Sequence, residues 1–236
     1  MAVGESNGAG AASPTNGGPE GGAVKDARDR PLSRAGFRLQ LAVSAALVAG
    51  EVAVLDHVQR DAHAYFERGE NAYATTSWEY PLAATSLYLV GVVFLGRRFF
   101  DAREPMKIDG FMTAYNAYQT LFNVWAVVGI LAEVYRRSLP FAGTVYKAGP
   151  AEERLGFLIY AHYQNKFLEL LDTVFMVVRK KRDQVSFLHV WHHTIIMWSW
   201  LAVMYVNPGG DAYFGSLLNS LIQCVVFPRG RGAELD

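Results

Sequence analysis

Several long apolar runs in this chain contain few or no charges. Residues 111–132 contain no Asp, Glu, Lys or Arg, and neither do residues 80–96. A helix needs about 20 mostly apolar residues to cross the hydrocarbon core of a bilayer. Both runs reach or approach that length, so they predict membrane-spanning helices rather than the core of a soluble domain.

Further apolar segments extend this pattern. Residues 155–178 and 186–208 are apolar but hold polar side chains in their interior, and residues 212–228 form a shorter run. Residues 39–55 contain Glu51, which leaves that segment open between a span and a surface helix. The predicted fold class is therefore all-α: a polytopic transmembrane helical bundle with five spans, or six if 39–55 crosses. A soluble bundle with apolar helices is the disfavoured alternative.

Composition excludes several other classes of protein. The 236 residues are 51% hydrophobic and carry a formal net charge of +0, so no basic field favours nucleic acid as a partner. Cys224 is the single cysteine, which excludes an intrachain disulfide and a site built from several cysteines.

The chain divides into four predicted regions. Residues 1–36 are rich in Gly, Ala, Ser, Asn and Pro and are expected to be disordered. Residues 37–74 are expected to form an amphipathic or membrane segment and a polar connector. Residues 75–228 are expected to form the transmembrane domain, and residues 229–236 a polar tail.

The positions of Lys and Arg predict the orientation in the membrane. Two clusters, Arg97 to Lys107 and Arg179 to Arg182, are separated by two spans and are both expected in the cytosol. The turn at 207–211 has no Lys or Arg and is expected on the opposite side. The segment 133–154 carries cations and stays unassigned.

Charged residues lie inside the predicted span 155–178. A charge near the centre of a membrane helix costs about 2.5–3.5 kcal/mol on insertion scales, so it needs a reason. Lys166, Glu169 and Thr173 fall within roughly 60° of one another on a helix, with Asp172 at the edge of that face. Lys166 and Glu169 are spaced to pair. This face is either a catalytic surface or a self-neutralised stripe that joins helices.

Three histidines share one face of the next predicted span. His189, His192 and His193 lie within an arc of about 140° on a helix. Three such rings favour a reactive or ligating role over a purely structural one. The turn near residue 183 places Thr173 and His193 at similar depths, about 15 Å or less below it. The two polar faces are thus expected to meet in the cytosolic half of the bilayer.

Two chemistries can use such histidines. Membrane di-iron enzymes need many imidazole ligands, whereas this chain has six histidines in total and one box of three. The other possibility is acid–base and nucleophilic work on an acyl thioester, in which a neutral imidazole attacks or shuttles a proton. The small number of histidines favours acid–base and nucleophilic chemistry on a thioester. A di-iron desaturase or hydroxylase stays as the alternative.

The same residues resemble the ELO family of fatty-acid elongases. The stretch from Lys166 to Thr173 matches the family motif K-x-x-E-x-x-D-T, and His189 to His193 matches its histidine box. Tyr115-Asn116 and the Pro208-Gly209-Gly210 turn also fit. The resemblance runs from about residue 75 to residue 222.

The resemblance implies a fold of seven helices around an acyl tunnel in the endoplasmic reticulum membrane. It also implies the decarboxylative condensation of a long-chain acyl-CoA with malonyl-CoA to a 3-oxoacyl-CoA. Gln184, before the histidine box, is similar to the pattern of elongases that act on polyunsaturated chains.

The resemblance further implies roles for individual residues. His192 is expected to accept the acyl group, and the other expected catalytic residues are His189, His193, Glu169, Asp172 and Lys166. Thr173, Asn116, Asn219 and Gln223 are expected to contact substrate. No metal or cofactor is expected. The expected partners are acyl-CoA, malonyl-CoA, membrane lipids, other elongation-cycle enzymes or a second elongase copy; nucleic acid is not expected. A non-catalytic partner of full-length elongases is a further alternative.

The chain also departs from the family pattern. The family continues with N-S-x-x-H, and here Asn219 and Ser220 are followed by Gln223 where the histidine belongs. The residues after it no longer match. We therefore expect a C-terminally truncated member that is inactive or nearly so.

Overall fold

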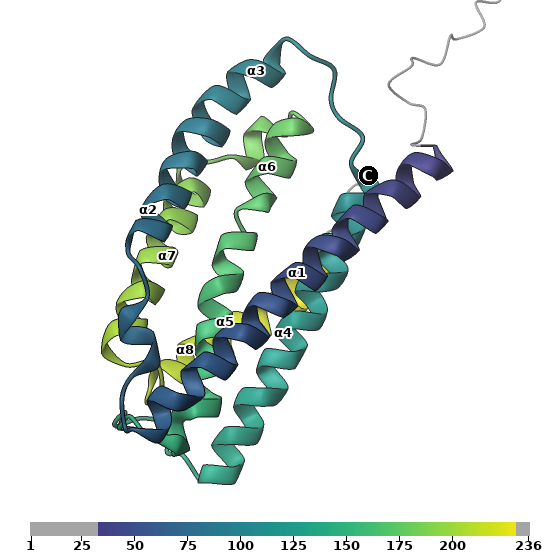
Figure 1. Ribbon diagram of the computed structural model, residues 1–236. Coiled ribbons are helices and arrows are strands. Elements are labelled where there is room, and N and C mark those ends of the chain that lie inside the picture. Colours follow the sequence, from purple (N-terminus) through teal and green to yellow (C-terminus); the bar gives the residue numbers. More distant parts are fainter. Residues whose placement is uncertain (1–32, 230–236) are drawn as a thin grey trace, which may run out of the picture. The chain divides into compact units, whose positions relative to one another are not determined.

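The computed structural model describes residues 33–229, and all regular structure in this part of the chain is helical (Figure 1). The long elements are α1 (Arg34–Glu67), α4 (Asp109–Arg137), α5 (Glu153–Leu168), α6 (Leu171–Val178), α7 (Phe187–Val206) and α8 (Ala212–Arg229). One further rod runs without a break through α2 (Glu79–Ser86), the π-helical segment η3 (Leu87–Gly96) and α3 (Arg97–Asp101). Three short 3-10 turns complete the set: η2 (Ala72–Thr75), η4 (Pro150–Glu152) and η5 (Arg182–Gln184). The predicted all-α class is confirmed.

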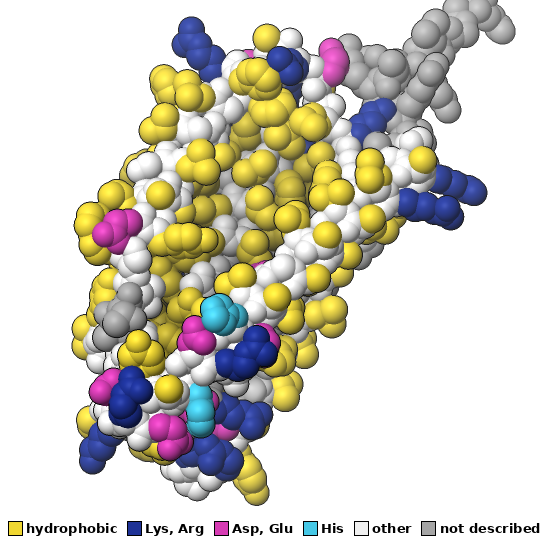
Figure 2. Space-filling model, in the orientation of Figure 1, with side chains coloured by type: hydrophobic (Ala, Val, Ile, Leu, Met, Phe, Trp, Pro, Cys, Tyr) yellow, Lys and Arg dark blue, Asp and Glu magenta, His cyan; other side chains and the backbone are white. Residues whose placement is uncertain are grey.

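Three of these rods are long and apolar enough to cross a membrane: α1, the rod Glu79–Asp101 and α4. The apolar part of α8, Ala212–Val226, is shorter. α1 includes residues 39–55, so this segment has the length and composition of a span. Apolar side chains cover much of the face seen in Figure 2, as expected for a surface that meets lipid. The protein is a multi-pass membrane protein.

Two boundaries differ from the sequence expectation. The predicted span 155–178 is not one helix, because it breaks at Glu169 and Leu170, where hydrogen bonds tighten to neighbours three residues back. α1 begins at Arg34 and is capped by the Ser33 hydroxyl, so the last three residues of the predicted tail are helical. Residues 1–32, and all but the first residue of the predicted tail 229–236, lie outside the described residues.

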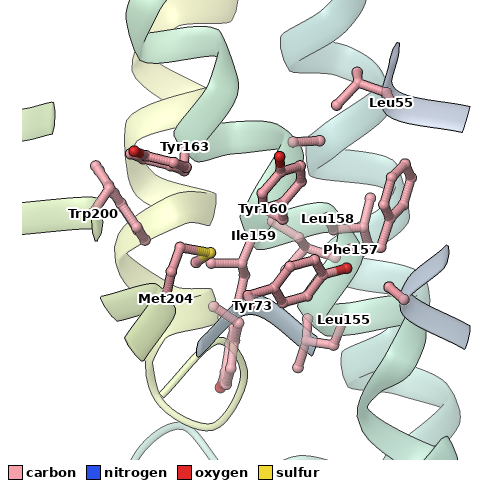
Figure 3. Close-up of a cluster of buried hydrophobic side chains, with 14 of the residues drawn as sticks. Leu55, Tyr73, Leu155, Phe157, Leu158, Ile159, Tyr160, Tyr163, Trp200 and Met204 are labelled. Carbon is pink, nitrogen blue, oxygen red and sulfur yellow. The ribbon is translucent and has the colours of Figure 1, made fainter. Parts of the chain in front are cut away.

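α5 is the helix around which the core forms. Leu155, Ile159 and Ala161 are fully buried, and the helix packs against α1, α4, α7 and α8. Figure 3 shows the cluster at its first half, where the Tyr160 ring stacks on Tyr73 with centroids 4.7 Å apart. Because α5 is covered by protein rather than lipid, its polar residues can be satisfied inside the bundle.

Gln40 on α1 forms hydrogen bonds with the backbone at the start of α4. The side-chain oxygen of Gln40 accepts hydrogen bonds from the backbone N–H groups of Gly110 (2.9 Å) and Phe111 (3.3 Å). Its amide nitrogen donates to the Lys107 carbonyl at 2.9 Å. These contacts satisfy N–H groups that a helix start leaves free. A Cβ at Gly110 would lie 2.7 Å from the Gln40 Cβ, so the close approach requires glycine there.

The two basic clusters predicted to share one membrane side lie against each other. Arg182 pairs with the carboxylate of Asp101, and Lys180 Nζ donates to the Asp101 carbonyl at 3.1 Å. The Met106 N–H donates to the Val178 carbonyl at 3.0 Å. The expectation that both clusters face the same compartment is therefore supported by direct contact.

The segment 133–154, left unassigned by its charges, lies at the other end of the helices. Asp211 in the next turn accepts hydrogen bonds from the N–H groups of Gly143 (2.9 Å) and Thr144 (2.7 Å). These two donors hold the pKa of Asp211 below its usual range. Three of the segment's arginines pair with buried glutamates: Arg136 and Arg154 with Glu133, and Arg137 with Glu152. These ion pairs hold the arginines of the segment against the ends of the helices.

Candidate functional site

A cavity of about 540 Å³ lies at the ends of α4, α6, α7 and α8. It is lined by most of the side chains that the sequence singles out: Asn116, Glu169, Asp172, His189, His192, His193 and Gln223. Met112, Phe175, Met176 and Val226 supply an apolar part of the wall. The predicted meeting of the two motif faces at one depth is thus confirmed, with contributions from four helices.

Lys166 and Asn219 are not on the cavity wall but directly behind it. Lys166 Nζ lies 2.5 Å from Glu169 Oε1 and 2.7 Å from Asn219 Oδ1. The Lys166 side chain is 1% exposed and the Glu169 side chain 2%. The pair that the helical spacing predicts therefore exists, and the ammonium fixes the carboxylate rather than facing open space.

A layer of amides supports this pair. Asn165 Nδ2 donates to Glu169 Oε1 at 3.2 Å and to Gln119 Oε1 at 2.9 Å. Asn123 Nδ2 in turn donates to the Gln119 carbonyl at 2.7 Å. All three amide side chains are fully buried. None of the three was predicted as a site residue. Their place inside apolar runs could have indicated them, because a buried amide needs hydrogen-bond partners.

Thr173 joins the two motif helices. Its hydroxyl lies 2.8 Å from Nε2 of His189 and 3.0 Å from the hydroxyl of Tyr88. Thr173 is fully buried and Tyr88 is 2% exposed. Thr173 is thus placed behind His189 and does not line the cavity. Tyr88 carries no sequence signal, since it is one aromatic residue in an apolar run.

The three histidines differ in their exposure. His192 is exposed, His189 is half-buried, and His193 is 7% exposed. The His193 ring lies between the others, with centroids 4.5 Å from His189 and 5.6 Å from His192. His193 Nδ1 is buried and has no hydrogen-bond partner within residues 33–229. Of the three rings, His192 is the one most open to an incoming substrate.

Cations stand at one edge of the cavity. Arg179, Lys181 and Gln184, at the turn between α6 and α7, line it together with the histidines. This turn belongs to the basic cluster predicted to face the cytosol. An anionic group entering from that side would meet both cations before it reached the histidines.

The donor geometry bears on the di-iron alternative. Within residues 33–229, no group of three or more His, Cys, Asp or Glu side chains is arranged so that it could hold a metal ion. The three histidines instead face a cavity that they share with Glu169 and Asp172. Imidazoles beside carboxylates in a partly closed site suit proton transfer and nucleophilic attack.

Comparison with known proteins points to one group. A model of the ELO (GNS1/SUR4) family matches residues 73–228. The chain is 34% identical over 143 residues to very long chain fatty acid elongase 7 of Rattus norvegicus, which covers 60% of this chain and 51% of that protein. It is 32% identical over 152 residues to very long chain fatty acid elongase 1 of Homo sapiens, covering 62% and 54%. Very long chain fatty acid elongase 5 of Tachysurus fulvidraco is 29% identical over 147 residues, covering 62% and 50%. The chain spans about half the length of these relatives.

Proposed function

We propose, because this chain belongs to the ELO (GNS1/SUR4) family, that it carries a condensing site for fatty-acid elongation. The reaction joins a long-chain acyl-CoA and malonyl-CoA into a 3-oxoacyl-CoA, with release of CO2 and free CoA. The observation that carries the proposal is a cavity lined by three histidines and two carboxylates, with cations at its edge.

In the first half-reaction, the exposed ring of His192 attacks the thioester carbonyl carbon through its unprotonated nitrogen. A C–N bond forms, the C–S bond breaks, and the CoA sulfur leaves with the electron pair. The proton released from the acylated ring goes to that thiolate. This step follows the general logic of a nucleophile that divides one difficult transfer into two easier ones.

In the second half-reaction, the bond between the malonyl carboxylate and its neighbouring carbon breaks, and CO2 leaves. The electron pair of that bond attacks the acyl carbonyl, so a C–C bond forms and the imidazole departs. The departing ring takes up a proton from water, because the proton it lost in the first half-reaction left with CoA. Electrons and atoms balance without an oxidant or reductant, so histidines and carboxylates suffice as reacting and orienting groups.

The remaining site residues bind or position. Arg179 and Lys181 are suited to the phosphates of CoA, because a charge-assisted hydrogen bond to phosphate is strong. Asn116 and Gln223 line the cavity and can contact substrate. Lys166 holds Glu169 from behind, Asn219 holds Lys166, and Thr173 holds His189. We therefore propose positioning roles for these three rather than substrate contact.

We further propose the endoplasmic reticulum membrane as the location, with lipids, other elongation-cycle enzymes or a second copy of the chain as partners. Gln184, exposed at the cavity edge, is the basis for proposing polyunsaturated acyl chains as substrates. A membrane-embedded site with cytosolic cations suits a substrate whose headgroup is soluble and whose tail is apolar.

The test is expression of the 236-residue chain in cells that lack their own elongase, followed by analysis of the acyl chains. Because the natural chain is expected to be nearly inactive, we expect at most small amounts of two-carbon-longer acids from it, larger amounts from its Gln223→His variant, and none when His192→Ala is added. Absence of longer acids from both would contradict the proposal. Two irons per chain in the purified protein would favour the di-iron alternative. Co-purification with a full-length elongase, without turnover of its own, would favour the non-catalytic one.

A further inference from the structure

The hydroxyl of Thr173 is used differently from other threonine hydroxyls in these helices. Thr120 and Thr194 donate to the carbonyl four residues back, at 2.7 Å and 2.9 Å. That is the usual behaviour of a threonine inside a helix. Thr173 instead lies between Tyr88 (3.0 Å) and His189 Nε2 (2.8 Å), with no other hydrogen-bond partner within the described residues. It forms the middle of a chain of three side chains.

The donor and acceptor roles in this series of hydrogen bonds follow from the number of hydrogens that its members carry. If Tyr88 donates to Thr173, then Thr173 donates to His189 Nε2, and every hydroxyl hydrogen has an acceptor. If the hydrogen bonds run in the opposite direction, His189 donates to Thr173 and Thr173 donates to Tyr88. The hydrogen of the Tyr88 hydroxyl then has no acceptor within the described residues. Leaving a buried donor unpaired costs about 1–3 kcal/mol. The first direction is therefore favoured.

The favoured direction leaves Nε2 of His189 as a hydrogen-bond acceptor. A neutral imidazole then carries its proton on Nδ1. Within the described residues, Nδ1 of His189 has no hydrogen-bond partner. This atom is also not fully buried. Since His189 lines the cavity, this N–H is open to it.

We infer that Tyr88, acting through Thr173, holds His189 in the tautomer protonated on Nδ1, so that His189 presents a hydrogen-bond donor to the cavity. The role of this donor rests on the proposed function. The N–H donates to the carbonyl oxygen of the thioester, which gains negative charge when His192 attacks. A donor fixed in advance at such an oxygen lowers the barrier, because it needs no reorganisation during the reaction. Tyr88 is thus a positioning residue, and His189 polarises the substrate while His192 attacks it.

Tyr88 reaches Thr173 from a distant part of the chain, and two features of the rod that carries it bear on this contact. It lies in η3, whose π-helical backbone is a form that is rare and often found at functional sites. About one turn earlier, Trp198 Nε1 on α7 donates to the Thr85 hydroxyl at 3.2 Å. The rod is thereby held against the histidine helix close to the Tyr88 contact.

The tautomer can be read directly by nitrogen NMR of histidine-labelled full-length chain in lipid nanodiscs, with the His189 signal assigned by its loss in His189→Gln. We expect Nδ1 of His189 to carry the proton and Nε2 to be unprotonated. Tyr88→Phe and Thr173→Val should convert this signal to a mixture of tautomers. Thr194→Val, the same change at a threonine on α7 whose hydroxyl bonds only the backbone, should leave it unaltered, and Thr173→Ser should retain it.

A proton on Nε2 in the natural chain, or a signal that does not respond to Tyr88→Phe and Thr173→Val, would overturn the inference. The rate measurement is separate. We expect Tyr88→Phe to lower kcat for condensation about tenfold and Thr173→Val to lower it on the order of a hundredfold, with KM little changed. If the tautomer is as expected and no condensation occurs in any variant, the proposed function fails while the assignment of His189 stands. If condensation occurs but Tyr88→Phe and Thr173→Val leave kcat unchanged, the assignment of a polarising role to His189 is wrong.

Discussion

Lys166 Nζ lies 2.5 Å from Oε1 of Glu169, and neither side chain is more than 2% exposed. A charge buried in this way is stable only while its partner is present. The ammonium is also held by Asn219 and the carboxylate by Asn165, at 2.7 Å and 3.2 Å. The pair is therefore both a structural requirement of the α5–α6 junction and the support of a cavity-lining carboxylate.

The first prediction concerns this pair. Glu169→Ala or Lys166→Met leaves one buried charge uncompensated, and we expect either change to cost about 3–5 kcal/mol of stability. The double variant Lys166→Met/Glu169→Leu removes both charges and should recover most of the folded protein, without condensation activity. Thermal melting of detergent-purified protein checks this. Double-variant stability no better than that of the single variants would show that the charges are not coupled.

The second prediction is that His192, unlike Lys166 and Glu169, is needed for activity but not for stability. His192 is exposed on the cavity wall, so His192→Ala removes a reacting group without opening the core. We expect condensation to fall on the order of 10²–10⁴-fold while the melting temperature stays near that of the natural chain. Acyl-chain analysis and melting of the same preparation give both quantities. Near-normal elongation by folded His192→Ala protein would refute the nucleophile assignment.

The third prediction concerns Gln223, which lines the cavity with the histidines where the family pattern has a histidine of its own. An amide can donate and accept hydrogen bonds, but it cannot take up a proton as imidazole does. We expect Gln223→His to raise the condensation rate above that of the natural chain. Gln223→Leu, of similar volume, serves as the control and should not raise it. Equal rates for the natural chain and Gln223→His would show that position 223 does not exchange protons.

The fourth prediction is a pH dependence at the other end of the helices. The N–H groups of Gly143 and Thr144 lower the pKa of Asp211, so the folded-state value lies below the unfolded one. The contribution of Asp211 is then present above its unfolded pKa and is lost as the pH falls through the lower folded value. We expect the Gly143 and Thr144 amides to lose protection from hydrogen exchange over that acidic range. In Asp211→Ala they should be unprotected at all pH values. If protection changes neither with pH nor with this substitution, the Asp211 carboxylate does not hold these two amides.

Local features of the site could be predicted from the sequence. The spacing of Lys166 and Glu169 predicts their pairing, and the spacing of His189, His192 and His193 predicts one shared face. The turn between the two helices sets Thr173 and the histidines at one depth, and the 2.8 Å contact of Thr173 with His189 agrees with this. These features depend on helical periodicity and a short connection, both of which are local.

Other features could not be predicted in this way. Tyr88 meets Thr173 from 85 residues away in the chain, and Gln119 meets Asn165 from 46 residues away. The break at Glu169 and Leu170 was also missed, since the residues there contain neither Gly nor Pro to announce it. Which amides and hydroxyls complete a buried network depends on how helices pack, and many packings satisfy the same hydropathy pattern.

Hydropathy and helical periodicity act along the chain, so they are enough to predict a bundle of membrane helices in which charged and imidazole side chains share a face. Which of those side chains face the cavity and which lie behind it depends on how the helices pack. His192 and Gln223 are on the wall, whereas Lys166 and Thr173 are covered by their neighbours. The physical reason is that burial and the direction of a hydrogen bond are set by contacts between helices, and those contacts join residues that no local pattern brings together.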